Sequence, residues 1–215
     1  MITVLGRATS SNVQAVMWCA GELGLPVDRR DVGGAFGGTD APEYRRLNPN
    51  GVVPTLAVGD EGIFESGAIV RYLAAEHGDE AFWPRDPLAR ARLDKWAEWG
   101  KVTLSPAFLL PVFAAHVRKR PEERDDAAIA RAAKALDPVL GVLDAHLAGS
   151  RFVGEDLSFA DIAPGHLMFR LHELMKERDL GLTPRPNVAR YYEDLRARPA
   201  FREHVMISYE SLRPS

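Results

Sequence analysis

The chain has 215 residues, of which 46% are hydrophobic and 27% are charged. This is the usual composition of a globular protein with a full core, in one large domain or two small ones. The net charge of −3 gives no reason to expect nucleic acid or an anionic membrane as a partner. No uninterrupted apolar run approaches the roughly 18 residues that span a bilayer, and no export signal is evident at the N-terminus. The single cysteine, Cys19, excludes an internal disulfide, so we expect a cytoplasmic protein.

Short strand and helix signals alternate over the first 77 residues. In chain order they predict a strand "ITVL", a helix over residues 13–24, a strand "PVDRRDV", a loop with a short helix from Pro42, a hairpin of "VVPTLAV" and "GIFE" around Gly59-Asp60-Glu61, and a helix "SGAIVRYLAAEHG". A crossover that carries a helix implies parallel strands, to which the hairpin adds antiparallel ones. The sequence therefore predicts a βαβ-ββα domain over residues 1–78.

The remainder of the chain is helical in character. Residues 79–86 read as a linker, and residues 87–215 form an all-α domain. We expect a long helix from Pro87 to about Lys119, bent at Pro106 and Pro111, because proline removes a backbone donor. A second long helix covers residues 125–148, a third covers "SFADIAPGHLMFRLHELMKE", and one or two short helices follow over residues 187–205.

A polar cluster stands where the first strand gives way to the first helix. Thr9, Ser10, Ser11 and Asn12 could simply begin the helix, since Ser and Asn are common N-caps. They could also hold a ligand there, because the free N–H groups and the dipole of a helix N-terminus favour negative charge. The residues alone leave both interpretations open.

Two further pairs stand at places where strands end. Pro54 within a predicted strand indicates either an edge strand or a cis-proline that leaves the backbone of Val53 facing a ligand. Ser66 is a natural N-cap of the next helix, and Glu65 beside it could pair with an ammonium group. A helix N-terminus next to a carboxylate would suit the head of an α-amino acid, although each motif alone is weak.

Taken in order, these pieces closely resemble the soluble glutathione transferase family. The resemblance runs from "TVLGRATSSNVQAV" through "NPNGVVPTL" and "ESGAIVRYLA" to "FVGEDLSFADI", and the "GGAFGG" loop is most similar to that of bacterial members. It implies a thioredoxin-like N-terminal domain, a helical C-terminal domain and a homodimer that binds glutathione in the first domain.

The resemblance also implies a role for each motif. Ser10 falls at the serine-type position that activates the glutathione sulfur, with Thr9, Ser11 and Asn12 beside it. Pro54 becomes a cis-proline whose neighbour Val53 meets the cysteinyl part of glutathione, and Glu65 and Ser66 hold the γ-glutamyl end. A hydroxyl donor and a helix dipole both favour thiolate over thiol, which lowers a pKa that begins near 8.5.

The chain departs from the family pattern in several places. Gly51 and Val52 stand where many relatives have a side chain for the glycyl carboxylate, so this contact would fall to Asn50 or to the 33–38 loop. The chain has no C-x-x-C motif, which excludes a thioredoxin-type dithiol mechanism, and Cys19 is expected in the core.

Other conspicuous residues receive mostly structural interpretations. Ser158 and Asp161 have the spacing of a capping box. Trp96 is expected in the core, whereas Trp99 and Thr103 are candidates for the second-substrate pocket because that helix borders the pocket in relatives. The histidines show no metal-ligand spacing, so no metal is expected, and the run "RKRPEERDD" reads as a solvated turn.

We therefore expect a glutathione transferase whose thiolate attacks an electrophilic carbon in a largely apolar pocket. Two alternatives remain. One is a glutathione-dependent disulfide reductase or peroxidase. The other is a non-catalytic protein that keeps the fold to bind a partner. The presence of Glu65 argues against this alternative, because folding alone does not require that residue.

Overall fold

The structure, a computed structural model, describes residues 2–214. Its N-terminal domain is built on a four-stranded sheet of order β2-β1-β3-β4, made of β1 (Ile2–Leu5), β2 (Val27–Arg30), β3 (Thr55–Val58) and β4 (Glu61–Phe64). Strands β1 and β2 run parallel, and β3 pairs antiparallel with both β1 and β4. The predicted βαβ-ββα order is confirmed. The hairpin turn is one residue shorter than predicted, because β4 already begins at Glu61.

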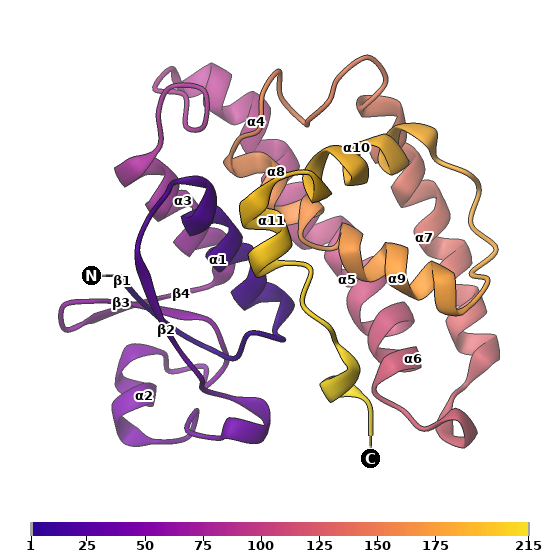
Figure 1. Cartoon of the computed structure of the whole chain (residues 1–215), viewed down its shortest axis with the longest axis horizontal. Helices are drawn as coiled ribbons and strands as arrows, with labels where there is room; N and C mark the ends of the chain where they lie inside the picture. Colours follow the sequence, from indigo (N-terminus) through magenta and orange to yellow (C-terminus); the bar gives the residue numbers. More distant parts are fainter. Residues whose placement is uncertain (1, 215) are drawn as a thin grey trace.

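Helices cover both faces of this sheet. Helices α1 (Ser11–Glu22) and α3 (Ser66–His77) pack against each other on one face, and the short α2 (Pro42–Leu47) lies on the other and contacts β4 (Figure 1). Helix α1 buries Val13, Val16 and Ala20, as its helical spacing predicted. Cys19 on the same helix is fully buried, and this burial strongly raises the pKa of its thiol, so it is a core residue and not a nucleophile.

The second part of the chain is a bundle of helices beside the first (Figure 1). Its helices are α4 (Pro87–Trp99), α5 (Ser105–Phe108), α6 (Ala115–Val117), α7 (Asp126–His146), α8 (Phe159–Gly165), α9 (Met168–Glu177), α10 (Pro186–Arg196) and α11 (Pro199–His204). Between α3 and α4 the chain has no regular helix or strand over residues 78–86.

The predicted long helix from residue 87 is continuous but not uniform. Wider π-helical turns occupy Gly100–Leu104 and Leu109–Ala114, directly before Pro106 and around Pro111. A proline ring clashes with the carbonyl four residues earlier, and a wider turn relieves that clash without ending the helix. By length and composition, Pro87–Val117 is the one candidate membrane span among the described residues, but core helices pass the same test, and its first part, α4, packs against α8.

The third predicted helix is wrong as a single element. It breaks after Gly165 into α8 and α9. The N–H of Leu167 bonds to the carbonyl of Pro164, three residues back, and the ring Nδ1 of His166 bonds to the Ile162 carbonyl at 2.9 Å. The Ile162 carbonyl also accepts the backbone N–H of His166 at 3.2 Å, so the helix is interrupted by the tighter turn at Leu167 and not by a lost bond at Ile162.

Candidate active site

A cleft of about 670 Å³ lies between the start of α1, the loops before Pro54 and the helical stretch that follows Leu104. From the N-terminal domain it is lined by Arg7, Ser10, Ser11, Asn12, Gly33, Gly34, Thr39, Gly51, Val52 and Val53. From the helical domain it is lined by Ser105, Pro106, Leu109, Leu110, Phe113, Ala114, Arg118 and Arg170. Four predicted site residues therefore meet in one cleft, facing a wall with both apolar and cationic side chains.

The residues of the polar cluster at the start of α1 differ in their surroundings, because Ser10 lines the cleft and Thr9 does not. Ser10 is the N-cap residue with an extended backbone, yet its side chain makes no capping hydrogen bond. It is 8% exposed and lines the cleft, and its hydroxyl has no hydrogen-bond partner within residues 2–214. Thr9 does not line the cleft and instead accepts a hydrogen bond from Arg170 at its carbonyl oxygen. The hydroxyl of Ser10 is thus free to meet a ligand at the positive end of α1.

The predicted cis-proline is confirmed, since the Val53–Pro54 peptide bond is cis. Val53 lines the cleft, and its backbone N–H and C=O have no hydrogen-bond partner in the described part of the chain. The preceding carbonyl of Val52 is held by the Tyr44 hydroxyl at 2.6 Å and by Asn48 Nδ2 at 2.8 Å. The loop is therefore anchored on one side while the backbone of Val53 remains available.

Helix α3 begins at an unusual backbone conformation. Glu65 is the described non-glycine residue with a positive φ, at 67°, and its side chain is exposed. Such conformations cost free energy for residues with a Cβ and persist mainly where function or surrounding structure requires them. Ser66 follows as the first residue of α3 and is buried. Its hydroxyl donates to Asn12 Oδ1 at 3.2 Å, which joins the start of α3 to the start of α1.

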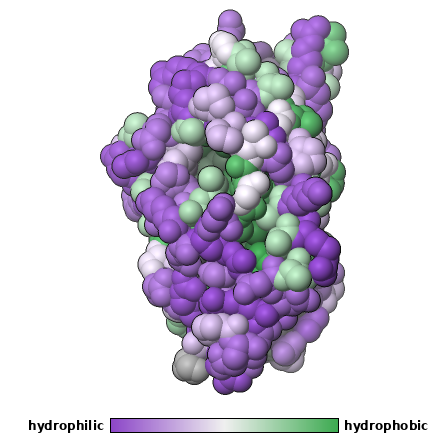
Figure 2. Space-filling model, turned by 90° about the vertical axis from the view of Figure 1, so that its right-hand side faces the viewer, coloured by the Kyte–Doolittle hydropathy of each residue, from purple (hydrophilic) through white to green (hydrophobic). Residues whose placement is uncertain are grey.

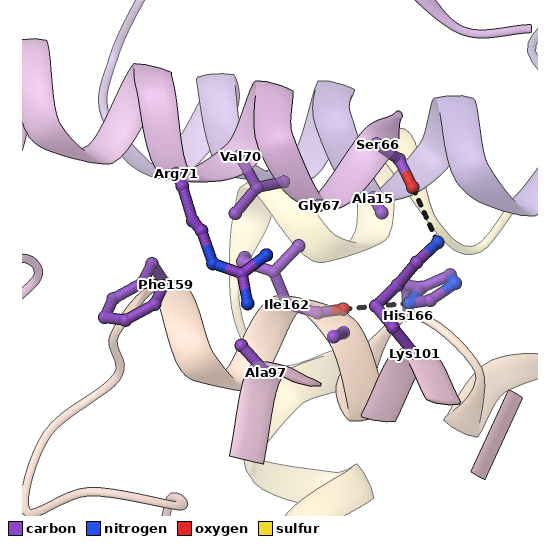
Figure 3. A pocket seen from close by; sticks show the side chains of 11 residues that line it. Ala15, Ser66, Gly67, Val70, Arg71, Ala97, Lys101, Phe159, Ile162 and His166 are labelled. Atoms are coloured by element: carbon purple, nitrogen blue, oxygen red, sulfur yellow. Dashed lines mark hydrogen bonds between the residues drawn. The ribbon is translucent and has the colours of Figure 1, made fainter. Parts of the chain in front are cut away.

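Lys101 of the helical domain completes this junction, although it belonged to no sequence motif. Its Nζ donates to Ser66 Oγ at 2.8 Å and to Asn12 Oδ1 at 3.0 Å, and Figure 3 shows the first of these bonds. Burial lowers the pKa of the ammonium group, and the negative charge of Glu65 opposes this effect. A cation therefore stands beside the three residues predicted to bind the γ-glutamyl end or to lie near the sulfur.

The other predicted site residues do not line the cleft: Thr9, Asn50, Pro54, Glu65, Ser66, Trp99 and Thr103. Asn50 is exposed, and its backbone N–H donates to Asn48 Oδ1 at 3.1 Å. Trp99 packs edge-on against Trp96, with ring centroids 5.4 Å apart, and Thr103 lies one helical turn further on. The residues of this helical stretch that line the cleft begin two residues later, at Ser105. The geometry therefore favours residues 105–118, and not Trp99 and Thr103, as the lining of the second-substrate pocket.

Three arginines that line the cleft were missed in the sequence analysis. Arg118 opens the run expected to be a solvated turn, and it is exposed, but it also lines the cleft. Arg7 and Arg170 line the cleft as well and belonged to no motif. No periodicity distinguishes an arginine that faces a cleft from one that faces solvent.

Outside the cleft, the described residues form a second cavity but no candidate metal site. Residues 2–214 hold no group of three or more His, Cys, Asp or Glu side chains that could bind a metal ion. A second cavity of about 520 Å³ lies between α7, α9 and α10, lined mainly by apolar residues such as Leu140, Met168 and Leu171. On the face of the molecule shown in Figure 2, apolar side chains lie among a larger number of polar ones.

Comparison with known proteins agrees with this geometry. The chain matches "Glutathione S-transferase, N-terminal domain" over residues 9–76 and "Glutathione S-transferase, C-terminal domain" over residues 126–194. It is 40% identical to the glutathione S-transferase GstB of Escherichia coli, over 96% of this chain and 99% of that protein. It is 33% identical to glutathione S-transferase 3 of Zea mays, over 95% and 93% of the two chains.

A solved structure gives the same result. The theta class glutathione S-transferase from Xanthomonas axonopodis pv. citri, solved with glutathione bound, is 40% identical, with a TM-score of 0.88 over 96% of this chain and 98% of that one. The chain therefore belongs to the glutathione S-transferase family, and it is a glutathione transferase.

Proposed function

We propose that this enzyme binds glutathione along the cleft and stabilises its thiolate with the hydroxyl of Ser10. The observation that carries the proposal is the unpartnered Ser10 side chain, which lines the cleft at the N-cap of α1. A hydroxyl that donated to the sulfur would favour the charged form, and the positive end of α1 would act in the same direction. The thiolate is the reactive nucleophile of such a reaction.

The other parts of glutathione can each be assigned to residues near Ser10. We assign the backbone of Val53 to the cysteinyl unit, because both of its polar groups are unpartnered in the described structure. We assign the γ-glutamyl end to Glu65 and Ser66, where Glu65 would meet the ammonium group and the start of α3 would meet the carboxylate. Gly33, Gly34 and Thr39 line the cleft, and we therefore assign the glycyl end to the 33–38 loop and not to Asn50.

The reaction then needs an electrophile beside the sulfur. The thiolate attacks an electrophilic carbon, a carbon–sulfur bond forms, and the leaving group departs with its electron pair while the thiol proton passes to solvent. The stretch from Ser105 to Arg118 supplies the wall on which we place this second substrate. A redox mechanism with a protein thiol is disfavoured, because Cys19 is fully buried.

Substituting Ser10→Ala tests the proposal. We expect the pKa of enzyme-bound glutathione to rise by roughly one unit, because a hydrogen bond to the charged form is lost. One unit corresponds to about 1.4 kcal/mol. The measurement is the ultraviolet absorbance of the bound thiolate as a function of pH, with Ser11→Ala as the matched control. An unchanged titration in Ser10→Ala, with a shifted one in Ser11→Ala, would move the role to Ser11.

We further propose that the enzyme is a cytoplasmic homodimer and that residues 79–86 are the linker between a domain of residues 1–78 and a domain of residues 87–215. The lone buried Cys19 is consistent with a reducing compartment. Sedimentation equilibrium of the purified protein measures the oligomeric state directly, and a monomer at micromolar concentration would contradict the dimer.

A further inference from the structure

Three arginines converge on the cleft from different parts of the chain. Arg7 follows β1, Arg118 ends the long helical stretch, and Arg170 belongs to α9. Arg7 lies along the loop at Gly34, where an added Cβ would come within 3.1 Å of its Cδ and Nε. All three line the same cleft as Ser10. We call Arg7, Arg118 and Arg170 the arginine cluster.

The arginine cluster has no acidic partner in the described structure. None of the three forms an ion pair within residues 2–214, whereas nearby arginines do. Arg29 pairs with Asp31 at 2.6 Å, Arg178 with Asp126 at 2.8 Å and Arg213 with Glu177 at 2.7 Å. No Asp or Glu is among the described residues that line the cleft, so the cluster leaves a net positive charge facing the cavity.

Arg170 is held in place by neutral groups. Its Nη2 donates to the Thr9 carbonyl at 2.8 Å and to Gln14 Oε1 at 3.1 Å, and its guanidinium lies 4.9 Å from the centre of the Phe113 ring. The residue is 2% exposed, and its Nε has no hydrogen-bond partner in the described chain. A buried charge with an unmet donor is costly unless a ligand completes it.

The three charges also repel one another. Burial, and after it the positive charges of Arg118 and Arg7, lower the pKa of Arg170 to about 10. Burial and the charge of Arg118 likewise lower the pKa of Arg7. Like charges held together raise the free energy of the free protein, and an anion bound among them would relieve this repulsion.

We propose that the arginine cluster binds a carboxylate on the second substrate, which makes this enzyme selective for anionic electrophiles with an apolar body. This inference rests on the proposed function, since it places that substrate on the wall opposite Ser10. The apolar body would lie against Leu109, Leu110 and Phe113 of the same wall. Guanidinium groups bind carboxylates through paired, charge-assisted hydrogen bonds.

Glutathione itself is the competing source of a carboxylate. Its γ-glutamyl carboxylate is assigned to the start of α3, away from the cluster. Its glycyl carboxylate could reach Arg7 beside the 33–38 loop, but Arg118 and Arg170 belong to the helical wall with the apolar residues. Two of the three arginines therefore lie on the wall where we place the electrophile, and we assign the carboxylate to that substrate.

The reaction that we infer is a displacement. With para-(bromomethyl)benzoate as a probe, the thiolate would form a bond to the benzylic carbon, the carbon–bromine bond would break, and bromide would leave with the electron pair. The thiol proton would pass to solvent, and nothing would be oxidised or reduced. The matching neutral probe is para-(bromomethyl)benzamide, which has the same shape without the charge.

Binding of the two product conjugates tests the inference without relying on turnover. We would measure calorimetrically the Kd of S-(para-carboxybenzyl)glutathione and of S-(para-carbamoylbenzyl)glutathione for the wild type, Arg118→Gln and Lys119→Gln. Lys119 is the matched control, because it is exposed, adjacent in sequence and absent from the cleft wall. We expect the wild type and Lys119→Gln to prefer the carboxylate conjugate about tenfold to hundredfold, the range for a charge-assisted hydrogen bond. Arg118→Gln should lose most of that preference.

The possible outcomes separate the alternatives. Equal affinity of the wild type for both conjugates would overturn the inference while leaving glutathione binding intact. An equal loss for both conjugates in Arg118→Gln would also overturn it, because the arginine would then serve glutathione. Failure of the wild type to bind S-methylglutathione would instead remove the proposed function. Turnover of the two bromomethyl probes, each corrected for its uncatalysed rate, should show the same preference in kcat/KM.

Discussion

At the residue scale, His166 shows how burial sets a protonation state. Its ring is 1% exposed, its Nδ1 donates to the Ile162 carbonyl, and its Nε2 has no partner within the described residues. Burial lowers its pKa to about 3, and the charge of Lys101 acts in the same direction. The imidazole is therefore neutral in the folded protein near neutral pH.

This neutral histidine predicts an acid-labile fold. Between pH 6.5 and about 3 the unfolded chain binds a proton at His166, whereas the folded chain does not. The contribution of the neutral His166 to the free energy of unfolding is therefore fully present above pH 6.5 and is lost as the pH falls through this range. We expect the wild type to lose about 2 kcal/mol more than His166→Asn between pH 7.5 and about pH 5. Denaturant unfolding at both pH values measures this difference, and equal losses would contradict it.

At the scale of the element, the start of α8 depends on one carboxylate. Asp161 accepts from the backbone N–H groups of Val153 and Ser158, each at 2.9 Å, and from the Tyr191 hydroxyl at 3.1 Å. The predicted capping box is confirmed, and it also ties the loop before α8 and helix α10 to the same side chain. Burial raises the pKa of Asp161 to about 6 although these bonds oppose the shift.

We expect Asp161→Asn to lower the free energy of unfolding by about 2–4 kcal/mol. The amide replaces one accepting oxygen with a donor, which leaves a buried backbone N–H without a partner. Asp156→Asn, in the exposed loop nearby, removes the same charge and should change stability by less than about 0.5 kcal/mol. Urea titration measures both variants, and a similar small effect in both would contradict the structural role of Asp161.

At the scale of the whole molecule, the site exists because two domains meet. Lys101 reaches from the helical domain to Asn12 and Ser66, which begin two different helices of the first domain. These contacts fix the starts of α1 and α3 relative to each other, and with them both proposed ends of the glutathione site. Lys101 is in this view a positioning residue that acts through Asn12 and Ser66.

Replacing Lys101 tests this coupling. We expect Lys101→Met to raise the Kd for glutathione about tenfold, since hydrogen bonds from a charged donor to both residues are lost. Lys95→Met removes an exposed charge from α4 and serves as the control with unchanged affinity. Calorimetric titration measures both, and circular dichroism verifies that each variant is folded. Unchanged affinity in Lys101→Met would show that the two helix starts are positioned without it.

Local patterns in the sequence were sufficient for most of the fold. Hydrophobic spacing predicted α1 and α3, the turn residues predicted the hairpin, and Ser158 with Asp161 predicted the start of α8. These features depend on residues within a few positions of one another. The break after Gly165 was missed because the tighter turn, in which the N–H of Leu167 bonds to the Pro164 carbonyl, leaves no signal in the hydrophobic spacing.

The sequence by itself determined the order of elements, the family and the three motifs around Ser10, Pro54 and Glu65. Only the tertiary structure decided which residues of the helical domain contact these motifs or face them across the cleft. Lys101 lies 89 residues from Asn12, and Arg170 lies 161 residues from Thr9, yet each forms a direct hydrogen bond to it. Helical spacing predicts which side of a helix is buried but not which distant chain segment covers it. The charge of the cleft is therefore a property of the folded molecule, because only packing brings Arg7, Arg118 and Arg170 together.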